Sequence, residues 1–149
     1  GYSSAASDVY KRQDPKDCKV TIKEVKKLFD TDIPIFAICL GHQLLALANG
    51  GDTVKMKYGH RGANHPVKDL KTGKVYISTQ NHGYMVKEES LDRKVAEVSF
   101  INVNDGTVEG VHYLGKNAQT VQFHPEACAG PLDTDFLFDV FMNMMEVSK

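Results

Sequence analysis

A short apolar segment, residues 33–38, leads directly into Cys39 and then into a helix-like stretch at residues 41–49. A nearly continuous apolar run of this length is typical of a strand buried on both faces, as in a parallel sheet covered by helices. Two glycines, Gly50 and Gly51, end the helix that follows. The segment therefore predicts an α/β fold in which Cys39 lies where a buried strand turns into the start of a helix.

The remaining pattern is also that of one α/β domain. Asp14 and Pro15 are suited to the start of a helix, and apolar residues recur at helical spacing up to Phe29. Residues 1–13 are rich in Ser and Ala, have no apolar period, and are predicted to be disordered or artefactual, so the domain is expected over 14–149. Five further strands are predicted at residues 53–57, 74–79, 95–100, 107–113 and 119–123, and a last helix over 136–145.

Charge and cysteine content exclude several classes of function. The 18 Lys and Arg residues are balanced by 19 Asp and Glu residues and interspersed with them, so no nucleic acid or membrane surface is expected as a partner. The longest apolar run is far shorter than the roughly 20 residues that span a bilayer. Three cysteines form no disulfide framework and no leader is recognisable, which predicts a cytoplasmic protein.

Cys39 is the first candidate for chemistry. A thiol at a helix N-terminus feels the positive end of the helix dipole, which favours the nucleophilic thiolate. Ala37 and Gly41 flank it in the order small-x-nucleophile-x-Gly, and this order permits a sharp turn that exposes a nucleophile. The alternative is a buried core cysteine, a common role for this residue type.

A thiolate that attacks an amide needs a residue to carry the proton to the leaving amine, and imidazole is suited to this task. His124 ends the predicted strand that runs through Thr120–Phe123, Pro125 prevents that strand from continuing, and Glu126 can orient the imidazole ring. Cys39, His124 and Glu126 thus form a candidate triad. The alternative for the His-Pro-Glu sequence is a turn that carries a surface acid.

The other histidines and cysteines give weaker signals. His60 and His65 have no acidic or cysteine partner at metal-ligand spacing, so no metal site is expected there. His82 follows a strand, in a segment predicted to be a loop that grips a polar substrate. Cys18 and Cys128 have no nearby base and are interpreted as structural.

Taken together, residues 38–43 and 123–127 resemble the class I (triad) glutamine amidotransferase family. Within that family, residues 59–67, 80–84 and the stretch from Gly130 resemble the small, glutamine-hydrolysing chains of carbamoyl-phosphate synthases. The resemblance implies a three-layer, flavodoxin-like fold. Its sheet would be mixed and largely parallel with flanking helices, and would be incomplete at the N-terminus.

The resemblance also implies the hydrolysis of L-glutamine to glutamate and ammonia. Cys39 would form a γ-glutamyl thioester, His124 would transfer the proton, and Glu126 would hold the imidazole ring. Five further residues are implied to bind glutamine or its oxyanion: Leu40, Gln43, Asn81, Gly83 and Tyr84.

A large synthetase subunit is the implied partner. Ammonia would pass to it for carbamoyl phosphate synthesis, which serves arginine and pyrimidine biosynthesis. ATP and magnesium would bind to that partner, and neither a cofactor nor a metal is expected on this chain.

One departure from the family pattern concerns the oxyanion site. The family has a Gly-Pro-Gly-Asp-Pro loop, whereas residues 11–13 here are Lys, Arg and Gln. Loss of one oxyanion donor typically costs about 10²–10³ in rate, so weak glutaminase activity is expected. The alternatives are a non-catalytic interaction module of the same fold, or the amidotransferase of another synthetase, such as those for anthranilate or GMP.

Overall fold

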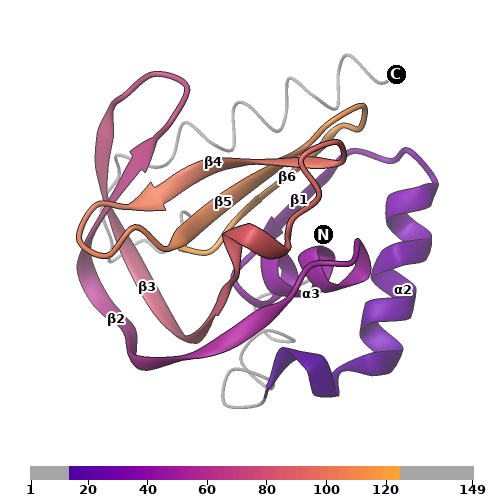
Figure 1. Ribbon diagram of the computed structural model, residues 1–149, viewed down its shortest axis with the longest axis horizontal. Helices are drawn as coiled ribbons and strands as arrows, with labels where there is room; N and C mark the ends of the chain where they lie inside the picture. The colour runs from indigo at the N-terminus through magenta and orange to yellow at the C-terminus, as the bar shows by residue number, and fades with distance from the viewer. Residues whose placement is uncertain (1–13, 125–149) are drawn as a thin grey trace.

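The computed structural model describes residues 14–124 of the chain, and it begins with two short helical elements (Figure 1). These are the 3₁₀ turn η1 (Pro15–Asp17) and the helix α2 (Lys19–Asp30). The Asp14 carboxylate accepts a hydrogen bond from the backbone N–H of Lys16 at 3.0 Å, as the predicted cap requires. The single helix expected here is therefore divided in two at Cys18, while its starting signal is confirmed.

Within the described residues, six strands form one sheet in the order β1-β6-β5-β4-β2-β3. A helix, α3 (Leu40–Ala48), follows β1 directly, and a second 3₁₀ turn, η2 (Glu88–Ser90), follows β3. The strands are β1 (Ile35–Ile38), β2 (Thr53–Asp69), β3 (Val75–Val86), β4 (Ala96–Asn102), β5 (Val108–Tyr113) and β6 (Ala118–Val121).

The sheet is mixed, as expected, but it is not largely parallel within residues 14–124. Only β1 and β6 pair in parallel, and the other four pairings are antiparallel. The expectation is corrected for a topological reason. Short connections join β2 to β3, β4 to β5 and β5 to β6, and each of these pairs is antiparallel, whereas a parallel pair needs a longer crossover. The chain returns from β3 so that β4 pairs with β2, again antiparallel.

The longest strands, β2 and β3, form a curved hairpin that extends beyond the other strands (Figure 1). Residues 80–84, which the sequence predicts as a loop, lie inside β3, and residues 59–67 lie inside β2. Gly59 and Gly62 have φ of 72° and 113°, and the register shifts on either side of this segment. Their backbone freedom bends the strand where sequence patterning indicates a break.

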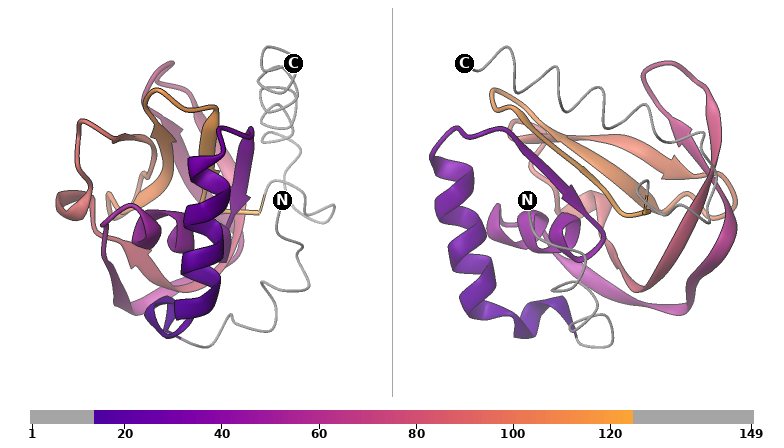
Figure 2. Two further views of the ribbon diagram at one scale, coloured as in Figure 1. Left: turned by 90° about the vertical axis from the view of Figure 1, so that its right-hand side faces the viewer. Right: turned by 180° about the vertical axis from the view of Figure 1, so that it is seen from behind.

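Both described helices cover the same face of the sheet, and α2 lies beside α3 (Figures 1 and 2). Phe29 of α2 meets the ring of Tyr113 edge-on, with 5.3 Å between the ring centroids. A second apolar cluster lies apart from these helices and contains Phe36, Val67, Phe100, Val121 and Phe123. The predicted helix over 136–145 and residues 1–13 lie outside the described residues. None of the helices within residues 14–124 is long and apolar enough to span a membrane.

His42 fixes the first turns of α3 to strand β6. Its side chain is fully buried, and Nδ1 lies 2.7 Å from the Thr120 hydroxyl oxygen. Burial penalises the charged imidazolium and, with a smaller contribution from His82, lowers the pKa of His42 from 6.5 to about 3. The helix that carries Cys39 at its N-terminus is therefore docked through a neutral histidine.

We predict that this histidine makes the protein less stable in mild acid. Between pH 6.5 and 3 the unfolded chain binds a proton at His42 and the folded chain does not, so the free energy of unfolding falls as pH falls. The contribution reaches about 1.4 kcal/mol per pH unit. Between about pH 6.5 and pH 5.0, the free energy of unfolding measured in urea should fall less for His42→Gln than for the unmodified chain. His112→Gln, at a half-buried histidine of β5, is the matched control, and an unchanged loss in His42→Gln would contradict the prediction.

Candidate active site

Cys39 occupies the predicted turn between strand β1 and helix α3. Its backbone φ is 55° and ψ is −108°, a combination that residues with a Cβ rarely adopt. A Cβ placed on Gly41 would lie 3.2 Å from the Ala37 Cβ, so the turn leaves room only for small residues on both sides. The sharp strand-to-helix turn predicted from the sequence is confirmed.

Cys39 contacts groups of strand β6, of Gln122 just after it, and of strand β3. Its backbone N–H donates to the Val121 carbonyl oxygen at 2.9 Å, which anchors the turn to β6. The Gln122 amide nitrogen lies 3.8 Å from Sγ, and the Asn81 carbonyl oxygen lies 4.0 Å from it. The residue is only 3% exposed. The thiol is thus enclosed by fixed neighbours and is not free to change rotamer at the surface.

His124 leaves the sheet at the same edge as Cys39. Ile38 and Val121 are partners in the parallel register of β1 and β6, so the residues that follow them emerge side by side. The His124 backbone N–H donates to the Thr79 carbonyl oxygen at 2.9 Å, which ties this segment to β3. Glu126, the third predicted triad residue, lies outside the described residues, as does Cys128.

Gln122 is a site residue that sequence reasoning missed. Its side chain is fully buried, its Nε2 faces the Cys39 sulfur, and its Oε1 accepts a hydrogen bond from Gln43 Nε2 at 2.9 Å. A polar residue between Val121 and Phe123, two positions before His124, was the available signal. The Gln43 amide nitrogen also donates to the Tyr84 carbonyl oxygen at 3.0 Å. Gln43 therefore links α3, β3 and Gln122, and its expected contact with substrate stays a prediction.

The other predicted substrate residues lie near the thiol on α3 and β3. Leu40 is the first residue of α3 and is buried. Asn81, Gly83 and Tyr84 belong to strand β3 rather than to the expected loop, and the Asn81 side of the strand meets Cys39 through the carbonyl contact described above. All five residues implied to bind glutamine thus lie on α3 or β3, the helix that begins after Cys39 and the strand that contacts its thiol.

The residues next to Asn81 in β3 point into a second buried cluster. His82 and Gln80 contact each other there, and Gln80 donates to the carboxylate of Glu109 on β5. Burial lowers the pKa of His82 to about 3 and raises that of Glu109 to about 8. His60 also belongs to this cluster, so the expectation that it lacks an acidic partner is wrong. Sequence spacing could not show the partner because β2 and β5 meet only in the folded sheet.

Comparison with known proteins defines the class to which this fold and site belong. The family model for glutamine amidotransferase class-I matches residues 12–144. The chain belongs to this family, and the expected α/β fold class is confirmed.

The curated relatives indicate a particular branch of the family. A carbamoyl phosphate synthase small chain from Oceanobacillus iheyensis is 57% identical over 136 residues, which cover 91% of this chain and 37% of the relative. Proteins of the same name from Caldanaerobacter subterraneus and Listeria innocua are 55% and 53% identical over 136 residues. The chain spans little more than a third of the length of these relatives.

Solved structures share the fold at low sequence identity. A glutamine amidotransferase from Thermotoga maritima aligns with a TM-score of 0.64 and 21% identity, covering 99% of this chain and 62% of that one. A protein from Thermoplasma acidophilum, provisionally assigned to GMP synthase, aligns with a TM-score of 0.76 and 21% identity. It covers 90% of this chain and 68% of that one.

We predict that the Cys39 turn is strained and that glycine would relieve the strain. A residue with a Cβ in such a backbone conformation costs of order 1–3 kcal/mol, whereas glycine adopts it freely. Cys39→Gly should therefore unfold at a higher urea concentration than Cys39→Ala, with a difference of about 1 kcal/mol in the free energy of unfolding. Equal stability of the two variants would show that the turn is not strained.

Proposed function

We propose that the chain carries the glutamine-hydrolysing centre of an amidotransferase, with Cys39 as the nucleophile. The single observation that carries this proposal is the strained backbone of Cys39 at the N-terminus of α3, directly after a strand that pairs in parallel with the strand leading to His124. A buried core cysteine does not need the strained turn.

The proposed reaction has two halves that share one set of groups. Cys39 attacks the side-chain carbonyl of glutamine, and the C–N bond breaks as His124 delivers a proton to the departing ammonia. Water then hydrolyses the γ-glutamyl thioester, releasing glutamate and the free thiol. Glu126 is proposed to hold the His124 ring in the required orientation. The backbone N–H of Leu40 lies at the start of α3 and is proposed to bind the oxyanion.

Substrate recognition is proposed to fall to the β3 segment that borders the thiol. Asn81, Gly83 and Tyr84 would bind the amino-acid end of glutamine, while the side-chain amide points towards Cys39. Gln43 supports this arrangement because it bonds the Tyr84 carbonyl oxygen and, through Gln122, reaches the nucleophile. Substrate position and thiol position are then set by one hydrogen-bonded chain.

The proposed destination of the ammonia is the large subunit of a carbamoyl-phosphate synthase. This proposal is supported by the name shared by the relatives at 53–57% identity. ATP and magnesium would act on the partner, and the glutaminase step would use only groups of this chain. The same identity favours this synthetase over those that make anthranilate or GMP.

A labelling experiment tests the proposed nucleophile and its pocket together. A chloroketone analogue of glutamine should alkylate Cys39 selectively, and excess glutamine should suppress the reaction. Mass spectrometry of the digested protein measures the label at each of the three cysteines. Cys39→Ala should lose the label.

Cys18 provides the matched control for that experiment. It is also buried, and burial raises the pKa of its thiol, so it should remain unlabelled. Cys18→Ala should therefore be labelled at Cys39 like the unmodified chain. Equal labelling of Cys18 and Cys39, or labelling that glutamine does not suppress, would refute the proposed site.

A second prediction concerns the amide group that faces the sulfur. Gln122→Met keeps a side chain of similar length but removes the donor to Cys39 and the acceptor for Gln43. One such hydrogen bond is worth about 1 kcal/mol, so the maximal rate of labelling should fall by roughly 3- to 10-fold. The analogue concentration at half-maximal rate should change less than the maximal rate. An unchanged maximal rate would show that Gln122 has no part in positioning the thiol.

A further inference from the structure

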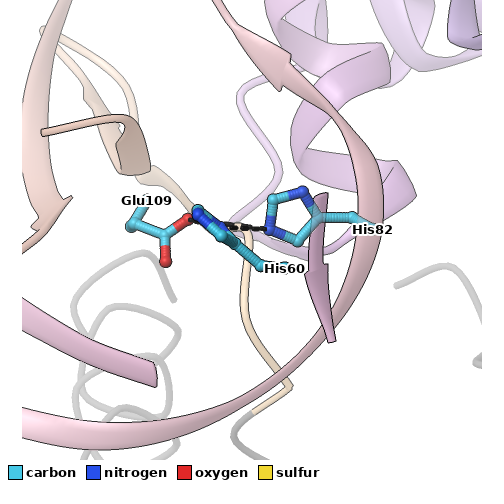
Figure 3. Close-up of side chains that lie close together, drawn as sticks. All are labelled: His60, His82 and Glu109. Carbon is cyan, nitrogen blue, oxygen red and sulfur yellow. Dashed lines mark hydrogen bonds and ion pairs between the residues drawn. The ribbon is translucent and has the colours of Figure 1, made fainter. Parts of the chain in front are cut away.

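Three buried side chains from different strands converge at one point of the sheet. They are His60 of β2, His82 of β3 and Glu109 of β5 (Figure 3). Their exposed fractions are 6%, 4% and 0%. His60 Nδ1 lies 3.2 Å from His82 Nε2, and Glu109 Oε1 lies 3.9 Å and 3.8 Å from these two nitrogens.

In each imidazole ring, the nitrogen that points away from the other ring lies within hydrogen-bond distance of an acceptor. His60 Nε2 lies 2.7 Å from the Asp105 carboxylate, and His82 Nδ1 lies 2.8 Å from the Tyr84 carbonyl oxygen. A carboxylate and a carbonyl only accept hydrogen bonds, so each outer nitrogen carries the ring proton. In the neutral rings, His60 Nδ1 and His82 Nε2 then carry no proton, and their lone pairs face each other.

The other polar atoms at this point are also electron-rich. Glu109 Oε1 is buried and accepts no hydrogen bond within residues 14–124. The Gln80 amide nitrogen donates to Ser78 Oγ and to the second oxygen of Glu109, which directs Gln80 Oε1 towards His82 Nε2 at 2.8 Å. Buried acceptors that face one another repel unless a proton or a bound cation lies between them, and a cation is the occupant that can contact all of them at once.

We propose that His60, His82 and Glu109 form a binding site for a divalent transition-metal ion of the zinc class. The inference is independent of the glutamine chemistry proposed above. Zinc lies about 2.0–2.2 Å from nitrogen and carboxylate ligands, so tetrahedral geometry separates ligand atoms by roughly 3.3–3.5 Å. The three observed separations bracket this range, and one ion reaches all three atoms after small shifts.

The surroundings of the cluster match those of bound metals. Histidines that ligate a metal donate their other N–H to a carboxylate or a backbone carbonyl, as His60 does to Asp105 and His82 does to Tyr84. Two imidazoles and one carboxylate suit zinc better than magnesium or calcium, which prefer oxygen ligands. Asp105 is 41% exposed at its side chain and connects the cluster to solvent.

The test uses the whole chain after removal of metal with a chelator. Calorimetric titration with Zn²⁺ should show one equivalent bound, and saturating Zn²⁺ should raise the melting temperature because only the folded state holds the three ligands together. Glu109→Gln and His60→Gln should each weaken binding by roughly 100-fold or more, which exceeds the 10–100-fold effect typical of an outer partner such as Asp105 in Asp105→Asn. His112→Gln, on the same strand as Glu109, should bind as the unmodified chain does.

Co²⁺ provides a readout that does not depend on the variants. Its visible spectrum and X-ray absorption should report nitrogen and oxygen ligands, including two imidazoles. Sulfur ligation would place the ion on a cysteine and overturn the proposal. Absence of stoichiometric binding, or full binding by a folded Glu109→Gln variant, would also overturn it and leave a proton on Glu109 as the occupant of the cluster.

Discussion

The parallel pairing of β1 with β6 is the interaction on which the candidate site depends. It aligns the carboxyl ends of two strands that are far apart in the sequence, and the bond from the Cys39 N–H to the Val121 carbonyl oxygen continues this pairing into the turn. The backbones of the proposed nucleophile, Cys39, and the proposed base, His124, are each tied to the sheet by a hydrogen bond from the main-chain N–H. Such fixed backbones suit a reaction that depends on orientation.

The backbone of Cys39 is strained as well as fixed to the sheet. The packing around α3 holds it in this conformation. A residue held in a rare backbone conformation persists only when its surroundings leave it no alternative. Here Gln43 joins helix α3 to Tyr84 and Gln122, while His42 fixes the same helix to Thr120. The polar side chains of α3 thus lock the turn from inside the protein, a role distinct from substrate contact.

The sequence predicted the features that depend on neighbours along the chain. The Asp14 cap, the helix after Cys39 and the sharp turn itself are confirmed because each is encoded by a few adjacent residues. The long β2–β3 hairpin was not predicted, since glycines such as Gly59 indicate a loop when the partner strand is unknown. Glu109 and Gln122 were missed for a related reason: their partners come from other strands, and a single sequence does not show which strands become neighbours.

The alternation of side chains along β3 has a consequence for how this protein can change during evolution. The Asn81 carbonyl oxygen contacts the Cys39 thiol and the Asn81 side chain is exposed, whereas the adjacent His82 side chain points into the cluster with Glu109. Because consecutive residues of a strand face opposite ways, inserting or deleting one residue here would exchange the two sets. Both regions depend on the register of β3. Each can therefore accept point substitutions, whereas an insertion or deletion in β3 would disrupt both.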